Sequence, residues 1–298
     1  MNWNTSIKGF LSYLMLERGL SSNTLEAYEG DIRKLAQYAQ ESKNLTPESV
    51  TTNDLRSFFG LLSELGILAS SQARILSAIK IFYQYLVFEE NLTSDPAALM
   101  EGPRLLRKLP DVLNIIEIQD LIAAIDLSKP EGMRNKAIIE VLYGCGLRVS
   151  ELVNLKLSDL SMDIEFIKVI GKGDKQRVIP IGSEAIKFLQ IYIKEYRVHL
   201  PIKSGFEDYV FLNRRGAALS RVMIFIMIKD LAEKINLKKN ISPHTFRHSF
   251  ASHLVEGGAD LRAVQDMLGH ESITTTEIYT HLDKSYLKDT IRQFHPRS

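Results

Sequence analysis

Two histidines, an arginine and a tyrosine in the C-terminal part of the chain could act together on a phosphodiester. They are His244, Arg247, His270 and Tyr279. A tyrosine hydroxyl has a pKa near ~10, so it is a weak nucleophile at neutral pH unless nearby bases and cations favour the phenolate. An arginine fork and two imidazoles suit the binding of a phosphate and of the charge that develops on it. The set predicts nucleophilic attack by Tyr279, provided that the fold brings the four side chains together.

The first helix that must position these side chains is predicted to begin at Ser242. Serine is a favoured N-cap, and the following Pro243 is favoured at the first helical position. Apolar residues then recur at every fourth position and predict a buried stripe: Phe246, Phe250 and Leu254. The polar residues fall on the opposite face of the same helix: His244, Arg247 and His248.

Two glycine signals divide the rest of this stretch into short elements. The glycine pair at 257–258 ends the first helix, and Asp260 can cap a second helix over Leu261 to Leu268. Gly269 ends that helix. The last two members of the set then follow in the next turn and on a third helix: His270 and Tyr279.

Two more basic residues stand earlier in the chain, at positions suited to a phosphate. Arg148 lies at the predicted start of a helix in GCGLRVSELVNLKLSDL, and Glu151 in that helix either holds a catalytic side chain or is a surface charge. Lys172 lies in GKGDKQ, a predicted turn between strands 165–170 and 177–181. The sequence lacks G-x-x-x-x-G-K-[ST] here, which argues against nucleotide hydrolysis. A lysine on such a hairpin can instead reach into a groove and deliver a proton.

Residues 1–102 are predicted to form a separate bundle of helices. Apolar residues at helical spacing mark four helices, and the last of them, from about Ser70 to Glu90, carries an aromatic stripe that is predicted to be core: Phe82 and Tyr83 with Ile75, Leu76, Ile79 and Leu86. Residues 103–110 hold two prolines and three basic residues and are predicted to be an exposed linker, either solvated or touching a phosphate backbone. Residues 111–298 are predicted to form the second domain, with Ser220 to Ile235 as a helix in the middle of its core and Tyr209 to Leu212 as a third strand.

Composition and charge set broader limits. The chain carries 37 Lys and Arg against 36 Asp and Glu, but residues 1–103 have a net charge of −4 and residues 104–298 a net charge of +5. The more basic C-terminal part fits a phosphate-handling domain. The single cysteine, Cys145, and the longest strongly apolar run, Val222 to Ile228, predict a cytoplasmic protein without a membrane span.

These motifs taken together resemble the tyrosine site-specific recombinases of the phage-integrase family. The resemblance rests on G-L-R-x-S-E at Arg148, on G-K-G-x-K-x-R at Lys172, on H-x-x-R at His244, and on L-G-H followed nine residues later by Tyr279 and T-H. The segments GLSSNTLEAY and SSQARILSAIKIFYQYL resemble the DNA-clasping domain of the Xer subgroup. The resemblance extends from Gly19 to Arg297.

The resemblance implies a fold, a catalytic set and partners. The fold is mainly α, with an N-terminal four-helix DNA-clasping bundle and a mixed α/β catalytic domain that holds a small antiparallel sheet. The implied catalytic residues are Arg148, Lys172, His244, Arg247, His270 and Tyr279. Tyr279 would form a 3′-phosphotyrosine while Lys172 protonates the leaving 5′-oxygen, so neither a cofactor nor a metal is expected. The implied partners are double-stranded DNA, a XerC-like recombinase in a cyclic tetramer and a FtsK-like DNA translocase.

Alternatives remain within and outside this family. A phage or transposon integrase would share the same motifs, and a type IB topoisomerase would share the chemistry. A non-enzymatic helix-turn-helix protein would use residues 242–279 to bind DNA, but it would leave Arg148, Lys172 and Tyr279 without a task. His244 and His248 are spaced like metal ligands on a helix, but no acidic partner accompanies them.

The last predicted helix, Asp283 to Phe294, carries an apolar stripe with no evident place in its own domain: Leu287, Ile291 and Phe294. We expect such a stripe to be buried in the groove of a neighbouring protomer, because an exposed stripe is a liability; the alternative is that the helix folds back on its own domain. Docking there would link assembly to the position of Tyr279. Truncation after Lys284 would then spare binding to a single half-site and abolish recombination.

Overall fold

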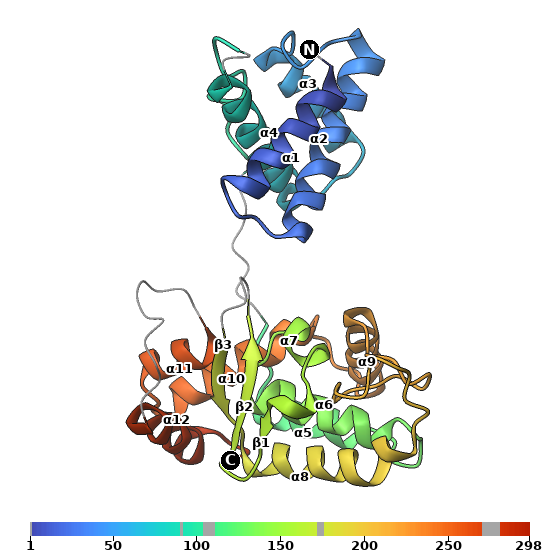
Figure 1. The fold of residues 1–298 in the computed structure, drawn as a ribbon, viewed down its shortest axis with the longest axis vertical. Coiled ribbons are helices and arrows are strands. Elements are labelled where there is room, and N and C mark those ends of the chain that lie inside the picture. Colours follow the sequence, from blue (N-terminus) through green and yellow to red (C-terminus); the bar gives the residue numbers. More distant parts are fainter. Residues whose placement is uncertain (1, 90–91, 104–110, 172–175, 270–280) are drawn as a thin grey trace. The chain divides into compact units, whose positions relative to one another are not determined.

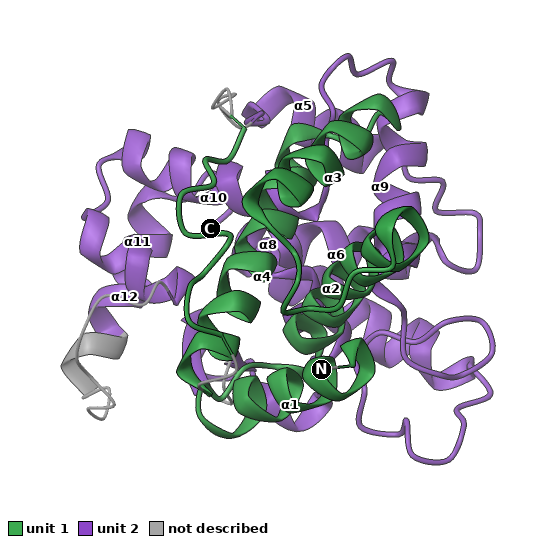
Figure 2. Cartoon of the chain, turned by 90° about the horizontal axis from the view of Figure 1, so that it is seen from above, with its two compact units in different colours: residues 1–108 green, residues 109–298 purple. Residues whose placement is uncertain are grey.

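The chain forms two compact units, Met1–Lys108 and Leu109–Ser298, coloured separately in Figure 2. The computed structural model describes residues 2–89, 92–103, 111–171, 176–269 and 281–298. Most of the predicted linker, residues 104–110, lies outside the described residues.

The first unit is a bundle of four helices, as the sequence predicts. They are α1 (Trp3–Leu16), α2 (Ser22–Lys43), α3 (Thr52–Glu64) and α4 (Ala69–Phe88). Local signals set their ends: Thr51 and Asp54 form a capping box at the start of α3, and Asn44 ends α2 in the left-handed conformation. The aromatic stripe of α4 is buried, with Phe82 packed edge-on against Phe10, so this prediction is confirmed.

The second unit combines helices with a small sheet (Figure 1). Its helices are α5 (Ile115–Ala123), α6 (Gly132–Gly144), α7 (Val149–Val153), α8 (Ser183–Ile191), α9 (Arg221–Lys234), α10 (Pro243–Gly257), α11 (Leu261–Leu268) and α12 (His281–Phe294). The sheet is antiparallel in the order β1 (Leu160–Ser161), β2 (Phe166–Ile170), β3 (Gln176–Pro180). Val169 pairs with Arg177 in the β2–β3 register, which places Arg177 near the end of the hairpin that leads into the turn. The predicted turn, residues 172–175, lies outside the described residues.

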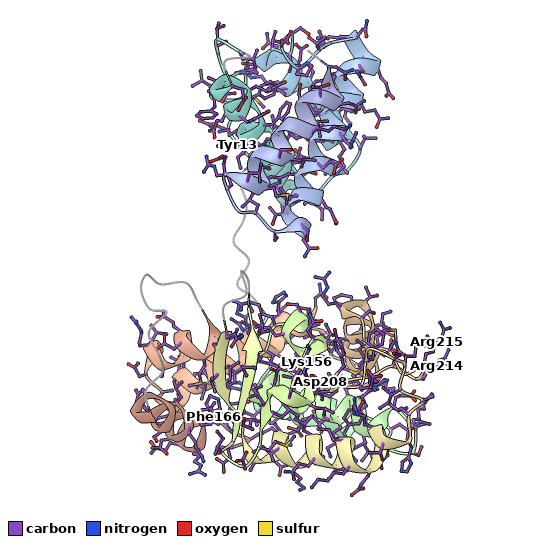
Figure 3. The ribbon with its side chains drawn as sticks, in the orientation of Figure 1. Tyr13, Lys156, Phe166, Asp208, Arg214 and Arg215 are labelled. Atoms are coloured by element: carbon purple, nitrogen blue, oxygen red, sulfur yellow. The ribbon has the colours of Figure 1, made fainter. Side chains whose placement is uncertain are left out.

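The predicted third strand at Tyr209 to Leu212 is wrong. This segment makes only two isolated bridges among the described residues, Lys156 with Tyr209 and Leu212 with Ala218. The strand that joins β2 and β3 in the sheet is β1. Backbone hydrogen bonds hold it beside residues 155–157, from the N–H of Val210 to the carbonyl of Leu155 at 2.9 Å and from the N–H of Leu157 to the carbonyl of Asp208 at 2.6 Å. The Asp208 carboxylate also accepts from the backbone N–H of Ser158 at 3.1 Å and from its hydroxyl at 2.8 Å. Lys156 and Asp208 accordingly lie close together in Figure 3.

The predicted central position of helix α9 is also wrong. Four of its residues are buried, at the spacing of a single helix face: Ile224, Ile228, Leu231 and Ala232. Most of the other apolar residues of α9 are exposed, Val222 to 65% and Phe225 to 44%. When a helix is apolar on all sides, its sequence does not show which face is buried, because that depends on the elements packed against it.

Among the described residues, no helix is both long and apolar enough to span a membrane.

Helix α12 packs in cis, which corrects the expectation that it docks on a neighbouring protomer. Leu287 and Ile291 are buried in the core of their own unit, where α12 lies against α10, α11 and β3 (Figure 1). The close packing requires a glycine on α10, because a Cβ on Gly257 would lie 2.8 Å from the carbonyl oxygen of Phe294. The apolar stripe alone could not distinguish its own core from a neighbour's groove.

The residues after α12 are tied to the same unit by a buried ion pair. The Arg297 guanidinium donates to both carboxylate oxygens of Glu140, at 2.7 Å through Nε, and to Glu184 at 3.3 Å. Burial raises the pKa of Glu140, and its bonds to Arg297 oppose that rise. The C-terminal segment is therefore part of the folded core of this unit.

Replacing Ile291 by Ala should destabilise the second unit by about 2–5 kcal/mol, because it removes a buried side chain and leaves a cavity. Urea denaturation measures the loss. The matched control is Tyr286→Ala on the same helix, where the side chain is 52% exposed and the expected change is within about 0.5 kcal/mol. Equal stability of the Ile291 variant and the wild type would contradict cis packing. Truncation after Lys284 should likewise weaken the fold, and not only assembly.

Candidate active site

Three arginines from three separate elements converge on the C-terminal end of α11. Arg177 on β3 donates through Nε to the carbonyl of Met267 at 2.9 Å. Arg247 on α10 donates to the carbonyl of Leu268. Arg148, at the N-cap of α7, donates to the carbonyl of Gly269 at 3.3 Å. These three successive carbonyls lie at the negative end of the α11 dipole, which favours positive charge.

The position of Arg247 follows from the packing of α10. Ser242 is the N-cap, Pro243 is at the first position, and the predicted apolar stripe is buried: Phe246, Phe250 and Leu254. Arg247 itself is buried, and its guanidinium also donates to the carbonyl of Gly146 at 2.8 Å. Gly146 has φ +57°, and a Cβ there would lie 2.5 Å from the Phe250 ring. The turn before Arg148 must therefore contain glycine for α10 to approach it.

Glu151 orients Arg148 within the first turn of α7. Its carboxylate accepts from the backbone N–H of Arg148 at 2.8 Å and from its guanidinium at 2.9 Å. The Glu151 side chain is buried, whereas that of Arg148 is 35% exposed. The guanidinium of Arg148 is thus held on one side and open to a ligand on the other. The sequence left two interpretations of Glu151 open. Its buried position and its bonds to Arg148 fit the one in which it holds another side chain in place, and not the one in which it is a surface charge.

The pKa values at this site reflect burial and crowded positive charge. Burial lowers the pKa of Arg247 to about 10, and the nearby Arg148 contributes to the same shift. Burial alone would raise the pKa of Glu151, but hydrogen bonds from Arg177 and Arg148 bring it below its ordinary value. At neutral pH the carboxylate of Glu151 and the guanidinium of Arg247 are therefore charged.

The structure brings some of the predicted catalytic residues together and leaves others outside its described part. Arg148 and Arg247 meet at the end of α11, and His244 lies on the same helix as Arg247 with an exposed side chain. The predicted polar face of this helix holds His244, Arg247 and His248. The two histidines are exposed as predicted, but Arg247 is buried. Lys172, His270 and Tyr279 lie outside the described residues. Their chain neighbours are described: β2 and β3 flank the lysine turn, and Gly269 precedes His270 directly.

Arg177 was missed as a site residue, although it is the last residue of the G-K-G-x-K-x-R motif. Its guanidinium is buried and forms a two-bond pair with the carboxylate of Glu151, at 2.7 and 2.8 Å. The sequence signal was a charged residue in a strand that is otherwise apolar. Burial of such a residue requires a charged partner.

The described residues contain no group of three or more His, Cys, Asp or Glu side chains that could hold a metal ion. The arginine and histidine side chains described at the site can bind a phosphate, stabilise its negative charge and transfer a proton.

Family models match both units. The phage integrase family matches residues 112–285, and the phage integrase N-terminal SAM-like domain matches residues 7–90. Together these two matches account for most of the chain.

Relatives of similar length share the sequence throughout. The chain is 44% identical to the tyrosine recombinase XerD of Listeria monocytogenes serotype 4b (strain F2365), over 99% of this chain and 100% of the relative. It is 42% identical to XerD of Staphylococcus aureus, over 99% of both chains. Among solved structures, XerH site-specific recombinase bound to palindromic difH substrate, a post-cleavage complex, is 25% identical, with a TM-score of 0.72 over 91% of this chain and 80% of the other.

Proposed function

Because the chain belongs to the phage integrase family, as a XerD-type tyrosine recombinase that cleaves and rejoins DNA at specific sites, we propose that Tyr279 is its nucleophile. The observation that carries this assignment is the meeting of Arg148 and Arg247 at the end of α11. The chain continues from that point through His270 to Tyr279. Two guanidinium groups therefore lie where the tyrosine segment begins.

The proposed reaction is a transesterification in two steps. The Tyr279 oxygen bonds to the scissile phosphorus, the bond to the 5′-oxygen breaks, and a 3′-phosphotyrosine results. A 5′-hydroxyl of another strand then attacks the phosphotyrosine and restores the DNA backbone. Arg148 and Arg247 stabilise charge on the non-bridging oxygens. His244 and His270 position or deprotonate the tyrosine and hydrogen-bond the phosphate. The phosphotyrosine conserves the bond energy, so the reaction as proposed needs no ATP.

Lys172 acts in this scheme as the general acid, since strands β2 and β3 support the hairpin that carries it. Lys172→Ala should not cleave ordinary DNA. Its cleavage rate should recover on DNA whose bridging 5′-oxygen is replaced by sulfur, because a thiolate leaves without a proton. Single-turnover cleavage measures both rates. Arg148→Ala serves as the control and should not recover. A Lys172 variant that stays inactive on the sulfur substrate would assign the lysine to phosphate binding.

We further propose that the protein resolves chromosome dimers in the cytoplasm, at a Xer-type site, with a XerC-like recombinase in a cyclic tetramer and under a FtsK-like DNA translocase. The similarity to the XerD recombinases of Listeria monocytogenes and Staphylococcus aureus supports this role, and the similarity to XerH bound to difH DNA supports the kind of substrate. The test is to select DNA sites from a random pool and then assay recombination with and without the second recombinase. Complete recombination by this chain alone would refute the partnership. Selection of a phage or transposon attachment site would favour the integrase alternative.

A further inference from the structure

Arg177 is the charged residue of the site that the proposed chemistry does not use. Its guanidinium is buried and makes three hydrogen bonds, two to Glu151 and one to the carbonyl of Met267. Bidentate pairing of this kind fixes the planes of both groups. The contacts of Arg177 link β3 to α7 and to the last turn of α11.

Glu151 creates an electrostatic difficulty that these contacts resolve. It orients Arg148 by accepting from its backbone and its guanidinium, at 2.8 and 2.9 Å. A lone buried carboxylate so close to Arg148 would cancel much of the positive charge that a phosphate must meet, and it would also repel that phosphate. The orienting group therefore needs a charge partner of its own.

Charge counting shows what the site requires. A phosphodiester carries one negative charge, and the attacking phenolate brings a second. Lys172 gives its proton to the leaving oxygen, so Arg148 and Arg247 are left to match these two negative charges, and they do so only if the charge of Glu151 is cancelled elsewhere. Arg177 bonds both carboxylate oxygens of Glu151 and supplies that positive charge. Consistent with this, the pKa of Glu151 lies below its ordinary value although burial acts to raise it.

We propose that Arg177 is a positioning residue that neutralises Glu151, so that Glu151 can orient Arg148 without weakening its interaction with the scissile phosphate. Through Met267, the same guanidinium fixes the turn that precedes His270. This inference rests on the proposed function, because it assigns Arg177 a part in charge stabilisation during DNA cleavage.

The test is single-turnover cleavage of a nicked half-site DNA at saturating protein, with DNA affinity and thermal unfolding measured separately. Arg177→Met should slow cleavage about 10²-fold, the order of one lost stabilising donor. Glu151→Gln alone should also slow cleavage, because it leaves Arg177 buried without its partner. The double variant should cleave at least tenfold faster than Arg177→Met, because it removes the uncompensated carboxylate. A double variant as slow as, or slower than, Arg177→Met would overturn the proposal.

A second substrate isolates the electrostatic part. Replacing one non-bridging oxygen by a methyl group removes the negative charge of the phosphate, so the defect of Arg177→Met should shrink at least tenfold on this DNA. An equal defect on both substrates would mean that Arg177 only supports the fold. If Arg177→Met does not fold, Arg177→Gln carries the same comparison, since it also lacks the charge. Arg177→Lys retains the charge and should gain nothing from Glu151→Gln.

The pair between Arg297 and Glu140 supplies a matched control, because it is also a two-bond Arg–Glu pair with a buried carboxylate in the same unit. Arg297→Met should lower thermal stability and leave the cleavage rate of the folded protein within about threefold. If it slows cleavage as much as Arg177→Met, the effect is general and the proposal fails. Absence of a covalent complex with the wild-type protein would instead refute the proposed function itself, so the two failures are distinguishable.

Discussion

Tyr279→Phe is expected to bind its DNA site with unchanged affinity and to form no covalent complex with it. Phenylalanine retains the ring but lacks the oxygen that would bond to phosphorus. The loss should be complete, because none of the other proposed catalytic residues carries a hydroxyl group that could bond to phosphorus as the tyrosine does. The measurement is a denaturing gel of protein incubated with nicked DNA, on which a covalent complex migrates slowly.

The control for this experiment is Tyr286→Phe, seven residues further along the chain, on α12, where the side chain is 52% exposed. This variant should form the complex as the wild type does. A covalent complex that survives in the Tyr279 variant and disappears in the Tyr286 variant would show that the nucleophile has been misassigned.

Arg148→Ala should reduce the cleavage rate about 10²–10³-fold, which corresponds to about 2.7–4 kcal/mol of transition-state stabilisation. DNA affinity should change little, because the affinity of a protein for the phosphate backbone is the sum of many Lys and Arg contributions. Arg148 is the better choice for this test than Arg247, whose guanidinium also holds the carbonyls of Gly146 and Leu268. Arg247→Ala would therefore combine a loss of chemistry with a loss of local structure.

The matched control is Arg262→Ala on α11, where the side chain is 63% exposed and pairs with Asp266 on the helix surface. Its cleavage rate should stay within about twofold of the wild type, because exposed pairs contribute little. Single-turnover cleavage and half-site binding are measured on the same DNA. If Arg148→Ala lowers affinity and rate by the same factor, the arginine only positions DNA.

The sequence was most informative where a signal acts locally. Ser242 with Pro243, Asp260 and Gly269 define helix ends by capping contacts within a few residues, and the structure places those ends as predicted. The alternating and β-branched residues on either side of GKGDKQ likewise predicted the β2–β3 hairpin. Such features depend on neighbours in the chain, so periodicity and capping rules are sufficient to predict them.

The sequence was least informative where tertiary contacts decide the outcome. Helix α9 is apolar on several faces, and only packing selects the one that carries Ile224 and Ile228. The buried pair of Arg177 and Glu151 joins residues 26 positions apart, and the bond to Met267 spans 90 positions. Periodicity carries no information about such distances. Periodicity likewise could not show that the apolar stripe of α12 packs in the core of its own unit.

The positions of the three arginines all depend on one short element, because each arginine donates to a carbonyl at the C-terminal end of α11. A helix of eight residues is unstable alone in water, so α11 persists only through its buried residues: Ala263, Val264, Met267 and Leu268. If its last turn frays, the carbonyl partners of Arg148, Arg177 and Arg247 move away together, and the charge arrangement is lost as a whole. The population of competent molecules is therefore set by the local unfolding free energy of α11. Substitutions that stabilise this helix, even on its solvent face, can raise the active fraction without touching the catalytic residues.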